Sequence, residues 1–472
     1  MARILFVLPQ QYAYPGLYYI CGALRDCGHK YSVIANDNQK KIEEKINDFK
    51  PILVAFPCLT GIHKIVLKTA AKIKKQFPAL KTLVGGIHPT LFPDIIKNPG
   101  VDFICRGEGE YPTCELLDAL SSGKTSFDIA NITWKKNGKI IANQMRQLIN
   151  PLDKIPFPDY SIFKNIEVIS QDTYPAVFMT RGCPFACTYC YNSDQKKLFK
   201  GLGKWVRSFS QERILDEVAS AIKNYPNTRA VFLGADTLGA NLKWLKILLR
   251  GYSARFDVPY TCLIRPEFIN EDLVRLLKQT NCHMIAFGIE SGSVRIRKNL
   301  LKRKYSNERI EKAAGLLKKI GIPFRTYNII GFPTETKKEM LATLKLNIKI
   351  KADFPWCSIF TPYPKTQLSE FTISQGYLDK NFSYDDVPLS FFNDTILKKV
   401  NRNYILNLHS FFQLLVLFPS LYPILKRLLK YKHNFIFKLV FKAIYSLVCI
   451  QSEKRSPVSF LKLALANRKL FK

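Results

Sequence analysis

The sequence contains Thr180-Arg-Gly-Cys183-Pro-Phe-Ala-Cys187-Thr-Tyr-Cys190-Tyr-Asn192, directly after the apolar run Ala176–Thr180. Three cysteines within eight residues can bring their thiolates to one metal centre. A structural zinc site usually takes four protein ligands as two separated pairs, whereas the other cysteines of this chain are isolated. Three thiolates leave one iron of a 4Fe–4S cluster open to another molecule. The stretch therefore favours an iron–sulfur centre at the end of a strand.

Composition and charge limit the fold class and the partners. The 472 residues suffice for two or three domains with buried cores, and 47% of them are hydrophobic. The formal net charge of +34 points to anionic partners, namely nucleic acid, anionic lipid or an acidic protein. Twelve scattered cysteines do not form a disulfide scaffold, and the segment Met1–Pro9 lacks the features of a signal peptide. We therefore expect reduced thiols and a cytoplasmic protein.

The first part of the chain, residues 1–145, alternates between short apolar runs and amphipathic stretches. The apolar runs are 4–8, 31–35, 52–57, 82–86 and 102–105. This alternation predicts an α/β fold with a doubly wound parallel sheet. The dipeptide Asn137-Gly138 between two further apolar runs predicts a β-hairpin.

Two loops follow strands of this predicted sheet, where doubly wound domains bind ligands. One loop carries Thr60, and the other carries Gly85, Gly86 and His88. Paired glycines let a backbone approach a ligand closely, although a tight turn is an equal alternative.

Residues 146–172 are rich in proline and are predicted to form an extended linker. Residues 173–370 repeat the strand–helix alternation and predict a partial (β/α)6 barrel. The six apolar runs are 176–180, 230–233, 260–264, 284–289, 325–330 and 357–360. Barrel sites lie at the C-terminal strand ends. The candidate residues found there are Cys183, Asp236, Arg265, Glu290, Ser291 and Gly331.

The spacing Cys-x-x-x-Cys-x-aromatic-Cys, with Tyr189 as the aromatic residue, resembles the motif of the radical S-adenosylmethionine superfamily. This resemblance implies a 4Fe–4S cluster ligated by Cys183, Cys187 and Cys190. Its open iron would chelate S-adenosylmethionine, which the reduced cluster cleaves to a 5′-deoxyadenosyl radical. Tyr189 is then expected among the cofactor-binding residues.

Further stretches resemble S-adenosylmethionine-binding segments of the same superfamily. Gly288–Gly292, with Glu290 and Ser291, resembles the segment that contacts the amino-acid and ribose portions. Ile329–Glu335, with Gly331, resembles the segment near the adenine. Asp236 stands where relatives often carry paired acids, but the neighbouring position is Ala235.

Arg265 is a candidate for bidentate binding of the S-adenosylmethionine carboxylate. A lone arginine is more often a salt-bridge partner, so this alternative stays open.

The stretches 84–90 and 101–110 resemble the subgroup with an N-terminal cobalamin-binding domain, which includes anaerobic magnesium-protoporphyrin cyclases and hopanoid methylases. This resemblance implies cobalamin as a second cofactor. The residues implied to bind it are Thr60, Gly85, Gly86, His88 and Glu108. The sequence has no Asp-x-His-x-x-Gly motif, so no histidine is evident as a lower cobalt ligand, and a structural role for His88 is equally well supported.

The expected activity is methyl transfer to carbon or phosphorus in a lipid-like or other hydrophobic small molecule. Three alternatives remain: a radical cyclase or oxidative enzyme, an RNA methylthiotransferase-like enzyme, and a non-catalytic cobalamin-binding protein. A flavodoxin or ferredoxin is expected as electron donor.

The last part, residues 371–472, is predicted to be a basic, amphipathic helical region. Residues 401–472 contain thirteen Lys or Arg and one acid, Glu453. The apolar stretches 411–425 and 434–450 are shorter than the roughly 20 residues that span a bilayer. We favour peripheral contact with the inner face of the membrane. The alternative is a helical cap on the barrel, and nucleic-acid binding is not expected because exposed aromatics are not interleaved with the basic residues.

Overall fold

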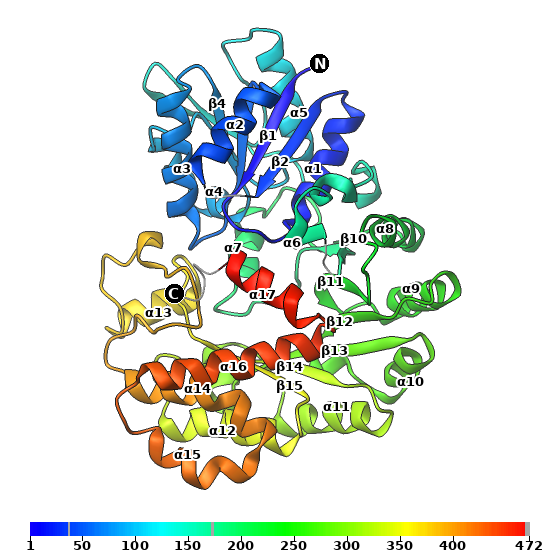
Figure 1. Cartoon of the computed structure of the whole chain (residues 1–472), viewed down its shortest axis with the longest axis vertical. Coiled ribbons are helices and arrows are strands. Elements are labelled where there is room, and N and C mark those ends of the chain that lie inside the picture. The colour runs from blue at the N-terminus through cyan, green and yellow to red at the C-terminus, as the bar shows by residue number, and fades with distance from the viewer. Residues whose placement is uncertain (36–37, 171–173, 468–472) are drawn as a thin grey trace. The chain divides into compact units, whose positions relative to one another are not determined.

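The computed structural model describes residues 1–35, 38–170 and 174–467, which form two compact units (Figure 1). Unit 1 comprises residues 1–172, 198–226 and 462–467, and the remaining residues form unit 2. The domain boundaries predicted above stay a prediction. Their ends at 171–173 and 468–472 lie outside the described residues.

Unit 1 is built on a sheet of seven described strands in the order β2-β1-β3-β4-β5-β6-β7. Strands β1 to β5 are parallel, and the order reverses between β1 and β3, which creates a topological switch point. This confirms the predicted doubly wound sheet. The strands are β1 (Arg3–Leu8), β2 (Lys30–Ala35), β3 (Leu53–Pro57), β4 (Lys81–Gly85), β5 (Phe103–Cys105), β6 (Ile132–Lys136) and β7 (Lys139–Ala142).

The predicted hairpin is also present, as β6 and β7 joined by Asn137-Gly138. Both turn residues have positive φ, 50° and 78°, which is the conformation that favours this dipeptide. The hairpin extends the sheet because β6 pairs antiparallel with β5.

Helices cover the strands of unit 1. They are α1 (Pro15–Asp26), α2 (Gln39–Phe49), α3 (His63–Gln76), α4 (Ile87–Leu91), α5 (Glu110–Ser121), α6 (Glu167–Ser170) and α8 (Gln211–Asn224). Helix α8 lies outside the predicted first domain. It joins unit 1 because Glu217, fully buried, accepts a 2.8 Å hydrogen bond from Tyr19 and pairs with Arg213 at 2.7 Å.

Unit 2 contains a parallel sheet of six described strands in the order β15-β14-β13-β12-β11-β8. This sequential, open order confirms the predicted partial barrel. The strands are β8 (Ala176–Phe178), β11 (Val231–Leu238), β12 (Tyr260–Ile264), β13 (Cys282–Glu290), β14 (Phe324–Ile330) and β15 (Phe354–Ile359). The short strands β9 (Thr180–Arg181) and β10 (Arg207–Ser208) lie outside this sheet.

Amphipathic helices connect the strands of unit 2. They are α7 (Tyr191–Leu198), α9 (Leu242–Arg255), α10 (Glu271–Gln279), α11 (Asn307–Lys319), α12 (Lys337–Lys349) and α13 (Gln367–Ser374). Several begin at a side-chain cap, and α12 has a full capping box between Thr336 and Glu339.

The C-terminal region is helical, as predicted. Its helices are α14 (Arg402–Leu417), α15 (Tyr422–Leu428), α16 (Phe435–Ser452) and α17 (Pro457–Ala466). Helix α14 is buried against β15, where His409 contacts the carbonyl of Cys357 at 3.2 Å and Gln413 donates to that of Pro355 at 2.8 Å. The alternative of a helical cap on the barrel therefore describes α14. The prediction that the stretch 411–425 lies on a membrane is wrong for residues 411–417, because most of their apolar side chains are buried in the core of unit 2.

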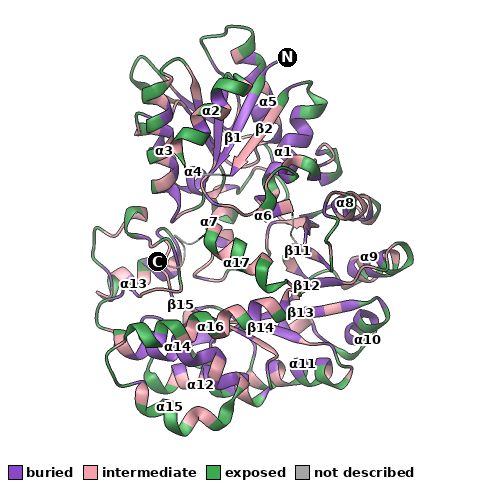
Figure 2. Cartoon of the chain, in the orientation of Figure 1, coloured by how far each residue is buried: buried purple, intermediate pink, exposed green. Residues whose placement is uncertain are grey.

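Helix α16 differs from α14 in its exposure. By length and composition alone it could cross a membrane, with a mean hydropathy of 1.6, and 28% of it is buried in the structure. Most of its residues are therefore partly or fully exposed (Figure 2).

A buried ion pair supports unit 1. Arg207 lies 3.0 Å from Glu108, and their side chains are 3% and 13% exposed. We expect Arg207→Met to leave the Glu108 carboxylate unpaired and to destabilise unit 1 by about 3–5 kcal/mol. Thermal unfolding would measure this against Arg275→Met, which removes an exposed pair with Asp272. Equal melting temperatures for the two variants would contradict the assignment.

Candidate active site

The cysteine motif forms the loop between β8–β9 and α7. It turns at Gly182, whose φ of +84° lies in the left-handed region. Cys183, Cys187 and Cys190 are all partly exposed. The Cys190 N–H donates to the carbonyl of Cys187 at 3.2 Å, which forms a tight turn between two of the thiols. The predicted ligands thus share one accessible loop at the C-terminal end of the first barrel strand.

The carboxylate of Asp236 holds this loop at both ends. It accepts a hydrogen bond from the Gly182 N–H at 2.7 Å and another from the Asn192 amide at 3.1 Å. The next residue, Thr237, lies 2.8 Å from the Cys183 sulfur through its hydroxyl. The contacts of Asp236 position the cysteine loop, and its sequence-based assignment to cofactor binding stays a prediction.

The donor set and the surrounding charges fit an iron–sulfur cluster. Burial raises the pKa of the Cys187 thiol, although the Arg303 and Arg265 guanidiniums oppose this shift. Burial also raises the pKa of the Cys190 thiol, to about 11. The described residues include no group of three His, Cys, Asp or Glu side chains that could hold a single metal ion. A cluster does not require such convergence, because each thiolate ligates a different iron.

Arg265 lies beside the loop. Its guanidinium is 3.6 Å from the centre of the Phe185 ring, 3.9 Å from the Cys187 sulfur, and paired with Glu267 at 2.5 Å. Both alternatives for this residue thus have structural support, since it has a salt-bridge partner and also faces the cysteine loop.

The buried guanidinium of Arg303 joins two predicted cofactor-binding residues. It donates to Glu290 at 2.6 Å and to the Tyr189 hydroxyl at 2.9 Å. Glu290 has a φ of +63°, and a Cβ at Gly288 would lie 2.2 Å from its carboxylate. The glycine is therefore required here so that the Glu290 side chain can fold back to Arg303.

Ser291 is fully buried. Its hydroxyl lies 3.5 Å from the Thr343 hydroxyl and 3.5 Å from the Glu335 carboxylate. Its carbonyl accepts a hydrogen bond from Arg297, a fully buried guanidinium. These contacts give Ser291 a structural role at the end of β13, and its ligand contact stays a prediction.

Gly331 follows β14 with a φ of +81°. Its N–H and that of Phe332 donate to the Glu335 carboxylate at 2.7 and 3.1 Å. Burial raises the pKa of Glu335 to about 8, and these two hydrogen bonds oppose the shift. The Glu335 carboxylate thus holds the backbone of the predicted adenine-binding loop in place through these two hydrogen bonds.

In unit 1, His88 is fully buried. Its ring stacks on that of His63 at 4.5 Å, and its Nδ1 lies 3.1 Å from the Thr60 hydroxyl. This packing supports the structural alternative for His88. A Cβ at Gly86 (φ +105°) would meet the carbonyl of Cys58 at 2.9 Å, so this glycine serves the packing of the two loops.

Gly85 differs from Gly86 because the space beside its Cα is open. An added Cβ would find its nearest neighbour, the Cys105 Cβ, only at 3.9 Å. Glu108, by contrast, is engaged by Arg207 and by the Ile149 N–H at 2.8 Å. The cobalamin-binding role of Thr60, Gly85, Gly86, His88 and Glu108 stays a prediction.

Sequence reasoning missed Arg303, Arg297 and His63. Arg303 stands in a basic run, Lys302-Arg303-Lys304, which has the appearance of a solvated surface segment. Its link to Glu290 arises only when the loop after β13 folds back.

Comparisons with known proteins agree with this geometry. The Radical SAM superfamily domain matches residues 177–346, and the B12 binding domain matches residues 4–117. An uncharacterized methyltransferase of Pyrococcus horikoshii is 34% identical over 373 residues, which cover 77% of this chain and 79% of that protein.

Two further similarities are more distant. An anaerobic magnesium-protoporphyrin IX monomethyl ester cyclase of Rubrivivax gelatinosus is 24% identical, over 74% of this chain and 64% of the cyclase. The structure of OxsB, a cobalamin-dependent S-adenosylmethionine radical enzyme with aqua-cobalamin and S-adenosylmethionine bound, superimposes with a TM-score of 0.68 at 15% identity. This match covers 99% of this chain and 75% of OxsB, and it shows the shared fold.

The cysteine loop can be tested by iron content. We expect Cys187→Ala to reduce the iron and sulfide bound after anaerobic reconstitution to background, because one of three thiolates is lost. The control is Cys27→Ala, since Cys27 is exposed and outside the loop. Equal iron content in both variants would place the cluster elsewhere.

The role of Arg303 can be tested by Arg303→Lys. Lysine keeps the charge but lacks the planar fork that reaches Glu290 and Tyr189 together. We expect unchanged iron content and a Kd for S-adenosylmethionine raised about tenfold to hundredfold. The matched control is Arg402→Lys, at an exposed pair with Asp394. An unchanged Kd, or a raised Kd that accompanies loss of iron, would indicate a structural role instead.

Proposed function

We propose that this chain, which belongs to the radical S-adenosylmethionine enzymes with a B12-binding domain, is a methyltransferase. Its proposed methyl acceptor is a carbon or phosphorus atom of a hydrophobic small molecule. The observation that carries the proposal is the three-cysteine loop at the end of β8, in a chain that also has a B12-binding domain. The cofactors of such an enzyme are a 4Fe–4S cluster, S-adenosylmethionine and cobalamin.

When bound, the cluster supplies the electron that cleaves S-adenosylmethionine to a radical, and cobalamin supplies the methyl group. The residues of this chain would bind and orient these groups. Cys183, Cys187 and Cys190 would hold the cluster. Asp236 keeps their loop in place through Gly182 and Asn192.

The segment after β13 would bind S-adenosylmethionine. Arg303 fixes the carboxylate of Glu290 and the hydroxyl of Tyr189 in one network, so both are positioned before the cofactor arrives. Arg265, 3.9 Å from the Cys187 sulfur, adds positive charge beside the anionic cluster. Reduction of the cluster would need an electron-donor protein such as a flavodoxin or ferredoxin.

Methyl transfer is favoured by the 34% identical relative, which is named a methyltransferase. Radical cyclisation is the second candidate, because a magnesium-protoporphyrin ester cyclase is 24% identical. The hydrophobic substrate class is proposed from the apolar, basic C-terminal region, which we also propose to hold the enzyme peripherally at the inner membrane face.

One assay separates the candidates. The reconstituted, reduced protein would be incubated anaerobically with cobalamin, a lipid extract and S-adenosylmethionine carrying a deuterated methyl group. We expect formation of 5′-deoxyadenosine and appearance of the deuterated methyl group in an extractable product. Formation of 5′-deoxyadenosine together with a product that has lost hydrogen and carries no deuterated methyl group would contradict methyl transfer and favour cyclisation.

A further inference from the structure

Helix α16 has an apolar face that the described residues leave uncovered. Phe435, Ile436, Leu439 and Leu447 are 47–70% exposed, and their spacing places them on one side of the helix. Monomeric proteins seldom expose so many large apolar side chains together, so the face calls for a partner. We call it the α16 face.

The opposite side of α16 anchors the helix to the barrel. Tyr445 packs edge-on against Trp356 of β15 at 4.9 Å, and Phe437 packs against Phe411 of α14 in the same way. At the end of the helix, Ser452 accepts a 2.5 Å hydrogen bond from Arg325 of β14. The orientation of the α16 face is thus fixed by its own unit.

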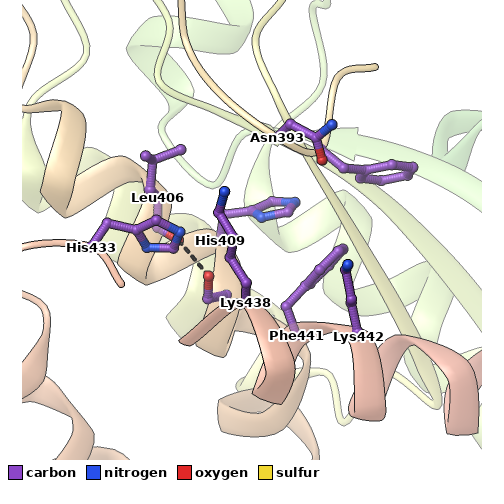
Figure 3. Close-up of a pocket in the computed structure, with 9 residues that line it drawn as sticks. Asn393, Leu406, His409, His433, Lys438, Phe441 and Lys442 are labelled. Atoms are coloured by element: carbon purple, nitrogen blue, oxygen red, sulfur yellow. Dashed lines mark hydrogen bonds between the residues drawn. The ribbon is translucent and has the colours of Figure 1, made fainter. Parts of the chain in front are cut away.

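A basic pocket runs along one edge of this face, between α14 and α16. Lys438 and Lys442, one helical turn apart, lie around it together with Phe441, His409 and His433 (Figure 3). The cavity volume of about 30 Å³ is enough for one or two water-sized groups, such as the oxygens of a phosphate.

The positive charge of the pocket comes from the lysines. Burial lowers the pKa of His409 to about 4, and burial with the charge of Lys438 lowers that of His433. Both imidazoles are therefore neutral at pH 7. The sequence from 402 to 452 contains seven Lys or Arg and no Asp or Glu, so the whole segment is complementary to an anionic surface.

We propose that the α16 face and its basic pocket form a docking surface for an anionic phospholipid bilayer. The apolar side chains would enter the boundary between headgroups and acyl chains, and the two lysines with Asn393 would receive a lipid phosphate. This docking surface rests on the proposed function, because a hydrophobic substrate held in a membrane would bring the enzyme to that membrane.

Vesicle flotation tests the surface without S-adenosylmethionine or substrate. The holoenzyme would be mixed with vesicles of phosphatidylcholine alone or with added phosphatidylglycerol. We expect binding to the anionic vesicles, and about 30-fold weaker binding for Lys438→Gln/Lys442→Gln, because each lysine at such a surface contributes about a factor of five. Phe435→Ser/Leu439→Ser should also weaken binding to the anionic vesicles, because these side chains would no longer enter the boundary between headgroups and acyl chains.

The matched control is Lys68→Gln/Lys72→Gln, an exposed pair with the same spacing on α3. It lowers the net charge equally and should leave vesicle binding unchanged. Three results would each overturn the proposal. The first is an equal loss of vesicle binding in both lysine variants, and the second is salt-sensitive binding to RNA but not to vesicles. The third is self-association that depends on concentration and is removed by Phe435→Ser/Leu439→Ser, without vesicle binding.

Formation of 5′-deoxyadenosine without substrate should be the same in all three variants, because their changes lie outside the cysteine loop. Loss of vesicle binding with intact cleavage of S-adenosylmethionine thus isolates the docking surface. Intact vesicle binding with no cleavage would instead count against the proposed function alone.

Discussion

The carboxylate of Asp236 is the constraint on which the proposed site depends. Its two oxygens accept from Gly182 and Asn192, residues on either side of the three cysteines. A loop with three thiols would otherwise sample many conformations, and its ordering costs entropy. Since Asp236 stands near the end of a long barrel strand, the sheet itself fixes where the cluster loop lies. The three thiols of this loop are partly exposed.

A second constraint on the proposed site comes from two buried guanidiniums. Arg303 reaches Glu290 and Tyr189, and Arg297 binds the carbonyl of Ser291. Buried charges are tolerated when each donor finds an acceptor, and a planar fork gives a defined geometry to the groups it joins. These contacts pre-form the segment that we propose for S-adenosylmethionine. Chemistry then comes from the cofactors, and the protein supplies position and charge.

Much of this could be predicted from the sequence, because the signals are local. The parallel strands follow from apolar runs, the hairpin from Asn137-Gly138, and the cysteine loop from its spacing. Other features depend on contacts between residues far apart in the chain. Helix α8 joins unit 1 through Glu217 and Tyr19, and the burial of α14 depends on carbonyls of β15. No local sequence pattern indicates these long-range contacts. The role of Arg303 was therefore missed, and the exposure of α14 was mispredicted.

The cysteine loop is proposed to hold a cluster with three protein ligands and one open iron. Mössbauer spectroscopy of the iron-57-reconstituted protein, with and without S-adenosylmethionine, tests it directly. We expect the signal of one iron in four to shift when S-adenosylmethionine is added, while the other three irons keep their parameters. Four irons that are unchanged by S-adenosylmethionine would show a fully ligated cluster and would contradict an open iron at this site.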